Sequence, residues 1–139
     1  MLSDGVEDRA AVWSRAEEEV TVLVVDDHES FRSALRELVD ATEGFFLVGE
    51  AGSGESALEA ADRLTPRMVI MDKRMPGIGG VEAARLIAAR HPRIITLLVS
   101  VEAPNEEHIP ADSVVVLARK QELTTTLLRE VWRAHGRNA

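Results

Sequence analysis

Five short apolar runs alternate with amphipathic segments between residues 20 and 118, and this alternation restricts the fold more than any other feature of the sequence. Each run has the length and β-branched content of a strand, and apolar residues recur with helical spacing in most of the intervening segments. Strands that alternate with helices are typical of βαβ units, which form a parallel sheet covered by helices. We therefore predict an α/β fold. The predicted strands are Val20 to Val25, Phe45 to Glu50, Met68 to Asp72, Ile94 to Val99 and Ser113 to Ala118.

Helical periodicity is clearest after the first strand, where one apolar stripe runs from Phe31 to Val39. The connection between the last two strands, VEAPNEEHIPAD, is different, because Pro104 and Pro110 bracket only five residues. We expect a short or distorted fourth helix there. The other predicted helices are Ala57 to Leu64, introduced by Ser53 and Gly54; Val81 to Arg90, stopped by His91 and Pro92; and Glu122 to His135, with Leu123, Leu127, Val131 and Trp132 inward and Gly136 at its end.

A chain of 139 residues with this pattern has room for one ordinary domain. Residues 1–19 contain six acids and two arginines, which accounts for about half of the net charge of −8, and we expect them to be a partly disordered extension. We assign residues 20–136 to the folded domain and 137–139 to a C-terminal tail.

Composition excludes several classes of function. The sequence has no clustered Lys/Arg face for nucleic-acid phosphates, so we expect no direct DNA or RNA binding by these residues. It has no cysteine, and therefore no disulfide, thiolate metal site or Cys nucleophile. No apolar run is long enough to span a membrane, and the acidic N-terminus does not resemble a signal peptide. These features predict a cytoplasmic protein that does not bind membranes.

Polar residues end four of the five predicted strands. Asp26 and Asp27 follow the first, Asp72 ends the third, Ser100 follows the fourth, and Lys120 comes shortly after the fifth. In an open parallel sheet the carboxyl ends of the strands share one edge, where ligands bind, so we expect these side chains to converge. Any one of these acids alone is read more simply as a turn residue or cap.

Three carboxylates in a small space repel each other by roughly 1 to 4 kcal/mol per pair at 4 Å, depending on the local dielectric. A divalent cation would neutralise them, and an all-oxygen ligand set suits Mg²⁺ or Mn²⁺. With a hydroxyl from Ser100 and an ammonium from Lys120, the site would have the groups that stabilise a phosphoryl group in transfer. Lys120 is one of only two lysines, against 14 arginines.

Asp72 is the candidate nucleophile, since an aspartate can accept a phosphoryl group as an acyl phosphate. In the loop that follows, Pro76 fixes a turn, and Gly77, Gly79 and Gly80 permit positive φ angles and close backbone approach. We interpret Lys73 as a solvated loop residue. The four histidines do not cluster, and we assign His28 to an exposed position at the start of a helix.

The motifs VLVVDD, VIMDKRMPGIGG, LLVS and ARK, in this order, resemble the response-regulator receiver domain over about Val20 to His135. The resemblance implies a flavodoxin-like, doubly wound five-stranded parallel sheet with strand order 2-1-3-4-5. It also implies phosphotransfer from a sensor histidine kinase to Asp72, with Mg²⁺ held by Asp27, Asp72 and the main-chain carbonyl of Arg74 and with Asp26 assisting, partly through water. Ser100 and Lys120 would contact the phosphoryl group.

The stretches DDHESFRSALRELVD and VGEAGSGESALEAA further resemble receivers that precede a LuxR-type helix-turn-helix. The 139 residues contain no such DNA-binding domain, so we expect either a single-domain regulator or a receiver separated from its effector domain. A homodimer or an effector partner is compatible with both.

The sequence departs from the family pattern on either side of the lysine that follows the last predicted strand. Receivers usually carry Tyr or Phe three residues before the lysine after the last strand, and this chain has Leu117 there; Gln121 replaces the common Pro or Asp after that lysine. These departures and the short fourth helix keep open a pseudo-receiver that signals without phosphate. A hydrolase of the haloacid dehalogenase type is disfavoured, because Arg74 occupies the position of its second acid.

Overall fold

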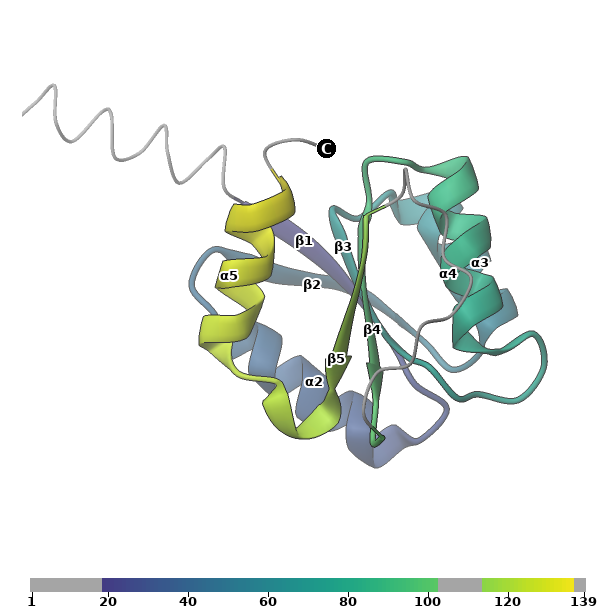
Figure 1. Ribbon diagram of the computed structural model, residues 1–139, viewed down its shortest axis with the longest axis horizontal. Helices are drawn as coiled ribbons and strands as arrows, with labels where there is room; N and C mark the ends of the chain where they lie inside the picture. The colour runs from purple at the N-terminus through teal and green to yellow at the C-terminus, as the bar shows by residue number, and fades with distance from the viewer. Residues whose placement is uncertain (1–18, 103–113, 137–139) are drawn as a thin grey trace, which may run out of the picture.

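The computed structural model describes residues 19–102 and 114–136, which form a five-stranded parallel sheet with helices on both faces (Figure 1). The strand order is β2-β1-β3-β4-β5, as the receiver resemblance implied. The expectations for residues 1–18, for the fourth helix within 103–113 and for the tail 137–139 lie outside the described residues. The strands are β1 Val20–Val25, β2 Phe45–Ala51, β3 Met68–Asp72, β4 Ile95–Ser100 and β5 Val115–Arg119.

The bounds of three strands, β2, β4 and β5, differ from the prediction by a residue or two. β4 begins at Ile95 because Ile94 N–H donates to the His91 carbonyl in a turn. β4 continues through Ser100, which pairs with Arg119 at the end of β5. These shifts place Ser100 on the sheet itself rather than in the loop after it.

The helices are α2 Glu29–Ala41, α3 Gly54–Leu64, α4 Gly79–Arg90 and α5 Thr125–His135, with a single 3₁₀ turn, η1, at Lys120–Glu122. Ser53 caps α3 by accepting from Ser56 N–H in a capping box, which explains why this helix starts immediately after it. The prediction that the last helix starts at Glu122 was wrong. Thr124 caps α5 by accepting from Leu127 N–H, so the helix starts one turn later.

Two apolar clusters fill the space between the sheet and its helices. α2 and α5 cover one face of the sheet, and α3 and α4 cover the other (Figure 1). β3 and β4 are buried along their whole length because they lie inside the sheet with helices on both sides. Leu128 and Val131 are the buried anchors of α5, whereas Leu123, Leu127 and Trp132 are only partly buried. None of the described helices has the length and apolar character needed to cross a bilayer.

Candidate functional site

The polar residues that end the strands come together at one edge of the sheet. Asp26, Asp27 and Asp72 each offer a carboxylate oxygen within 4.8 Å of the others. Lys120 Nζ lies 3.5 Å from Asp26 Oδ2 and 3.4 Å from Asp72 Oδ2. Parallel strand direction produces this convergence, because the carboxyl ends of β1, β3 and β5 lie on the same side.

Asp26 is completely buried and held from several directions. Its main-chain N–H donates to the Ala51 carbonyl, and its own carbonyl accepts a 2.7 Å hydrogen bond from Arg32 of α2. The carboxylate oxygen Oδ1 accepts from the His28 N–H at 2.8 Å. A carboxylate fixed in this way cannot turn toward solvent, so its charge faces Lys120 and Asp72.

Asp72 is the last residue of β3 and is only 5% exposed. Burial raises the pKa of Asp72 above its ordinary value of 3.8, and the neighbouring Asp26 raises it further, while the Arg74 N–H and the charge of Lys120 oppose this. The Arg74 N–H donates to Asp72 Oδ1 at 3.2 Å, which leaves Oδ2 facing Lys120. The site therefore contains a carboxylate whose charge is poorly compensated by the protein alone.

Lys120 lies between the two buried carboxylates and an aromatic ring. Its Nζ is 4.1 Å from the centre of the Phe31 ring on α2, within the range of a cation–π contact. The ring and the carboxylates together fix the ammonium at the mouth of the site. Phe31 was predicted only as a core residue of the helical stripe, and periodicity gave no signal for its contact with Lys120.

Asp27 and His28 form the outer side of the acid cluster. Asp27 Oδ1 is buried and accepts no hydrogen bond from a described residue, although His28 Nδ1 lies 3.2 Å away. His28 Nδ1 is also 3.3 Å from Asp26 Oδ1, while 69% of the His28 side chain is exposed. The sequence prediction of an exposed histidine at a helix start is confirmed, since His28 precedes α2, and its ring also lies beside both acids.

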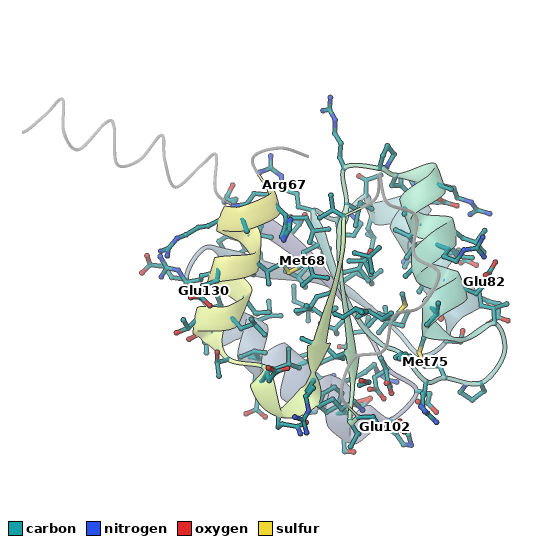
Figure 2. All side chains as sticks on the ribbon, in the orientation of Figure 1. Arg67, Met68, Met75, Glu82, Glu102 and Glu130 are labelled. Carbon is teal, nitrogen blue, oxygen red and sulfur yellow. The ribbon has the colours of Figure 1, made fainter. Side chains whose placement is uncertain are left out.

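Ser100 ends β4 at the same edge of the sheet. Ser100 Oγ donates a 2.7 Å hydrogen bond to the Glu102 carbonyl. The Glu102 carboxylate lies 2.9 Å from Arg74 Nη2, across the opening of the site. Figure 2 shows Glu102 and Met75 together at this end of the molecule. The serine hydroxyl is thus bonded to the backbone that follows β4.

Glycines bring the loop after Asp72 close to the strand end. Gly77 and Gly79 have φ angles of 81° and 79°, in the left-handed region that favours glycine. A Cβ at Gly80 would lie 2.1 Å from the Asp72 carbonyl oxygen, which leaves no room for a side chain. The expectation that these three glycines supply positive φ and close approach is confirmed.

Leu117 lies on β5, three residues before Lys120, and is partly buried in the apolar cluster between the sheet and the α3/α4 layer. Its position in the fold is the one predicted. It brings no hydroxyl or ring edge to the site. Arg74 lies two residues after the end of β3, and its main-chain N–H donates to Asp72 Oδ1.

The donor set fits a hard divalent cation. Three carboxylates converge, one of their buried oxygens has no hydrogen-bond donor, and the ammonium of Lys120 balances at most one of the three charges. Oxygen ligands of this kind match Mg²⁺ and Mn²⁺. Asp26, Asp27 and Asp72 are the described side chains that could hold such an ion, with His28 beside them.

The comparisons agree with this geometry. The family model described as the response regulator receiver domain matches residues 22–115. The protein is 44% identical over 82 residues to the response regulator GacA of Pseudomonas viridiflava, an alignment that covers 59% of this chain and 38% of GacA. It is 42% identical over 87 residues to the response regulator UvrY of Escherichia coli strain K12, with 61% and 40% covered. The chain thus spans about two fifths of the length of these relatives.

Solved structures show the same fold. The receiver domain of the putative response regulator NarL from Mycobacterium tuberculosis superposes with a TM-score of 0.68 at 27% identity, covering 84% of this chain and 96% of that one. A LuxR-family two-component response regulator from Aurantimonas gives a TM-score of 0.58 at 31% identity, with 60% of each chain covered. With the match to the family model, these likenesses show that the chain belongs to the response regulator receiver domain family.

Proposed function

We propose that the protein is the phosphoryl-accepting receiver of a two-component system, with Asp72 as the acceptor and a sensor histidine kinase as the donor. The observation that carries the proposal is the position of Asp72 Oδ2, at the end of the central strand and 3.4 Å from Lys120 Nζ, with Asp26 and Asp27 beside it. Family membership supports the same role, since the matched residues 22–115 include Asp26, Asp27, Asp72 and Ser100.

The transfer forms one bond and breaks one. A carboxylate oxygen of Asp72 attacks the phosphorus of the kinase phosphohistidine, the phosphorus–nitrogen bond breaks, and an aspartyl phosphate and a free histidine result. Lys120 Nζ, now shared between Asp26 and Asp72, would then contact a phosphoryl oxygen. The burial that raises the pKa of Asp72 also keeps bulk water away from its carboxylate.

Asp26, Asp27, Asp72 and the main-chain carbonyl of Arg74 would hold Mg²⁺, or Mn²⁺ in its place. The ion would neutralise the negative charge of the acids and of the phosphoryl oxygens. The buried Asp27 Oδ1 without a donor and the fixed orientation of Asp26 support this assignment.

Ser100 supplies the switch in this proposal. Its hydroxyl would leave the Glu102 carbonyl and donate to a phosphoryl oxygen, which loosens the chain where it leaves β4. Leu117, the neighbour of Leu98 across the β4–β5 pair, would repack in place of the aromatic side chain that most receivers have there. The site itself needs no ring at this position.

The output is proposed from the relatives. GacA and UvrY are named response regulators, and one structural neighbour is a LuxR-family regulator, so we propose regulation of transcription in the cytoplasm through an effector domain or partner protein. A homodimer would fit such an output. These residues catalyse only their own phosphorylation and dephosphorylation in this proposal.

Incubation of the protein with acetyl phosphate tests the proposal without the kinase. With Mg²⁺ present, mass spectrometry of the intact protein should show one added phosphoryl group, and chelation of the metal should abolish it. Asp72→Asn should remain unmodified, and the matched Asp62→Asn, at an exposed acid of α3, should react as the original does.

The second candidate is a pseudo-receiver, favoured by one observation: Leu117 fills the switch position with an aliphatic side chain. Such a module would bind its partner in a single state. Failure to take up phosphoryl groups from acetyl phosphate, together with failure to bind Mg²⁺ in a calorimetric titration, would select this candidate.

A further inference from the structure

A cavity lies at the end of the molecule opposite the acid cluster. It has a volume of about 530 Å³, which falls within the range of small-molecule sites, and it is formed where β3 and β4 begin and where α3, α4 and α5 end. Figure 2 shows Arg67, which lines this cavity, far from Glu102 and Met75 at the phosphoacceptor end. The proposed function uses none of its residues.

Positive charge dominates the cavity lining. Arg67, Arg90 and Arg93 all line it, together with His91, and no acid does. Asp62 lies outside the lining and pairs with Arg90 at 2.9 Å and with His91 Nε2 at 2.7 Å.

A simpler explanation accounts for only one of these arginines. Basic residues in the last turn of a helix compensate its dipole, and Arg90 is the last residue of α4. Arg67 and Arg93 are on no helix: Arg67 precedes β3, and Arg93 lies in the turn between α4 and β4. Among the residues described, Arg93 has no ion-pair partner. Two guanidinium groups therefore line the cavity for reasons other than helix capping.

Trp132 provides an independent observation. Its ring lines the cavity with the guanidinium carbon of Arg67 5.8 Å from the ring centre. Its indole N–H is buried, and no described residue accepts a hydrogen bond from it. An indole N–H can only donate, and a buried donor without an acceptor is costly to the fold. Together, the Arg67 guanidinium and the Trp132 ring form one cationic and aromatic wall of the cavity.

The backbone around the cavity is well fixed. The Arg67 N–H donates to Thr21 at 3.0 Å, the Arg67 carbonyl accepts from Ile95 N–H at 3.0 Å, and Ile94 N–H donates to the His91 carbonyl at 3.0 Å. Pro66 and Pro92 precede Arg67 and Arg93 and restrict both turns. The arginines therefore extend from rigid positions, which lowers the entropic cost of binding a ligand.

We propose that this cavity binds a small, multiply charged oxyanion of the phosphate ester or polyphosphate class through Arg67, Arg90 and Arg93. Guanidinium groups pair with phosphate oxygens in a planar, two-bond geometry, and three of them call for a ligand with more than one negative charge. A ligand here would contact the starts of β3 and β4 and the end of α5 at once. It would stabilise the folded domain without touching Asp72.

Calorimetric titration of the Asp72→Asn protein with pyrophosphate, in the presence of a chelator, tests this proposal. The variant and the chelator exclude contributions from the acid cluster, so the result is independent of the proposed phosphoryl transfer. We expect saturable 1:1 binding that weakens with salt, and a weakening of about tenfold or more in Arg93→Gln and in Arg90→Gln. Arg85→Gln, also on α4 but outside the cavity lining, is the matched control and should bind as the parent does.

A second arm identifies the source of the phosphate. Titration with adenosine triphosphate and with inorganic phosphate, under the same conditions, distinguishes a nucleotide from a free anion by which of the two binds more tightly. The proposal would be overturned if the parent did not bind pyrophosphate. It would also be overturned if Arg93→Gln, Arg90→Gln and Arg85→Gln bound pyrophosphate with equal affinity. Arg85, Arg90 and Arg93 are exposed, so their substitutions should leave the fold of the Asp72→Asn parent intact, and thermal unfolding confirms that each variant is folded.

Discussion

The Ser100 hydroxyl donates its hydrogen bond to the Glu102 carbonyl at 2.7 Å, not to the acid cluster on the same edge of the sheet. The Glu102 carboxylate in turn reaches Arg74, whose N–H bonds Asp72. The structure therefore shows a chain of contacts from Asp72 through Arg74 and Glu102 to Ser100. A new group on Asp72 that attracts the serine hydroxyl has to break the last contact in this chain.

Ser100→Ala should therefore act mainly on the phosphorylated form. Without the activator, loss of one hydrogen bond should lower the free energy of unfolding by about 1 kcal/mol. With Mg²⁺ and beryllofluoride, a mimic of the phosphoryl group, the thermal stabilisation of the original protein should be larger than that of the variant. Ser100→Thr keeps the hydroxyl and should respond as the original does. Equal stabilisation in all three proteins would exclude Ser100 from the switch.

Gly80→Ala should destabilise the site by steric overlap. The added Cβ would meet the Asp72 carbonyl at 2.1 Å, and we expect a loss of about 2 kcal/mol or more in urea denaturation. Gly79→Ala is the matched control: it has φ of 79° but open space around the added atom, so it should lose only about 1 kcal/mol from backbone strain. Equal losses would show that the loop yields freely at Gly80.

The Lys120–Phe31 contact should be measurable by a double-mutant cycle. Phe31→Leu removes the ring that lies 4.1 Å from the ammonium while keeping an apolar side chain in the α2 stripe. Combined with Lys120→Met, urea denaturation should give a coupling free energy of about 0.5 to 1 kcal/mol. A coupling of zero would mean that the carboxylates alone fix the position of Lys120.

The acid cluster also predicts how stability depends on pH in metal-free buffer. The pKa of Asp72 is raised in the fold from 3.8, so the folded state binds more protons than the unfolded state between 3.8 and the raised pKa. The contribution of Asp72 to stability therefore falls as pH rises through this window. Asp72→Asn should gain stability relative to the original as pH rises, as measured by urea denaturation.

Asp62 supplies a control of opposite sign. The hydrogen bond from His91, with Arg90 nearby, lowers the pKa of Asp62, so its contribution is present above 3.8 and is lost as pH falls through the lowered pKa. Asp62→Asn should lose stability relative to the original as pH rises. If both variants changed in the same direction with pH, the assigned cause of the Asp72 shift would be wrong.

Much of the fold could be predicted from the sequence, because strands and helices are indicated by local, periodic patterns of apolar residues. The five runs gave the strands, and the family motifs gave their order. The start of α5 was misplaced because Glu122 and Leu123 suit a helix, yet the cap at Thr124 sets its first turn. Gly136 ends α5 as predicted, but with an ordinary φ of −66° instead of the left-handed conformation that favours glycine.

The sequence predicted which residues form the site but not the contacts between their side chains. Strand ends identify Asp26, Asp72 and Lys120 because parallel strands bring their carboxyl ends together. The contact of Phe31 with Lys120 and the turn of Ser100 toward Glu102 depend on side-chain rotamers and on packing between distant segments. No spacing in the sequence encodes those choices.

The chemical identity of the phosphorylated residue tests the central proposal most directly. After treatment with acetyl phosphate and Mg²⁺, borohydride reduction converts an aspartyl phosphate to homoserine, and tandem mass spectrometry of the peptides locates it. We predict homoserine at position 72 and at no other acid. Homoserine at position 26 or 27, or a protein without any, would contradict the assignment of Asp72 as the phosphoryl acceptor.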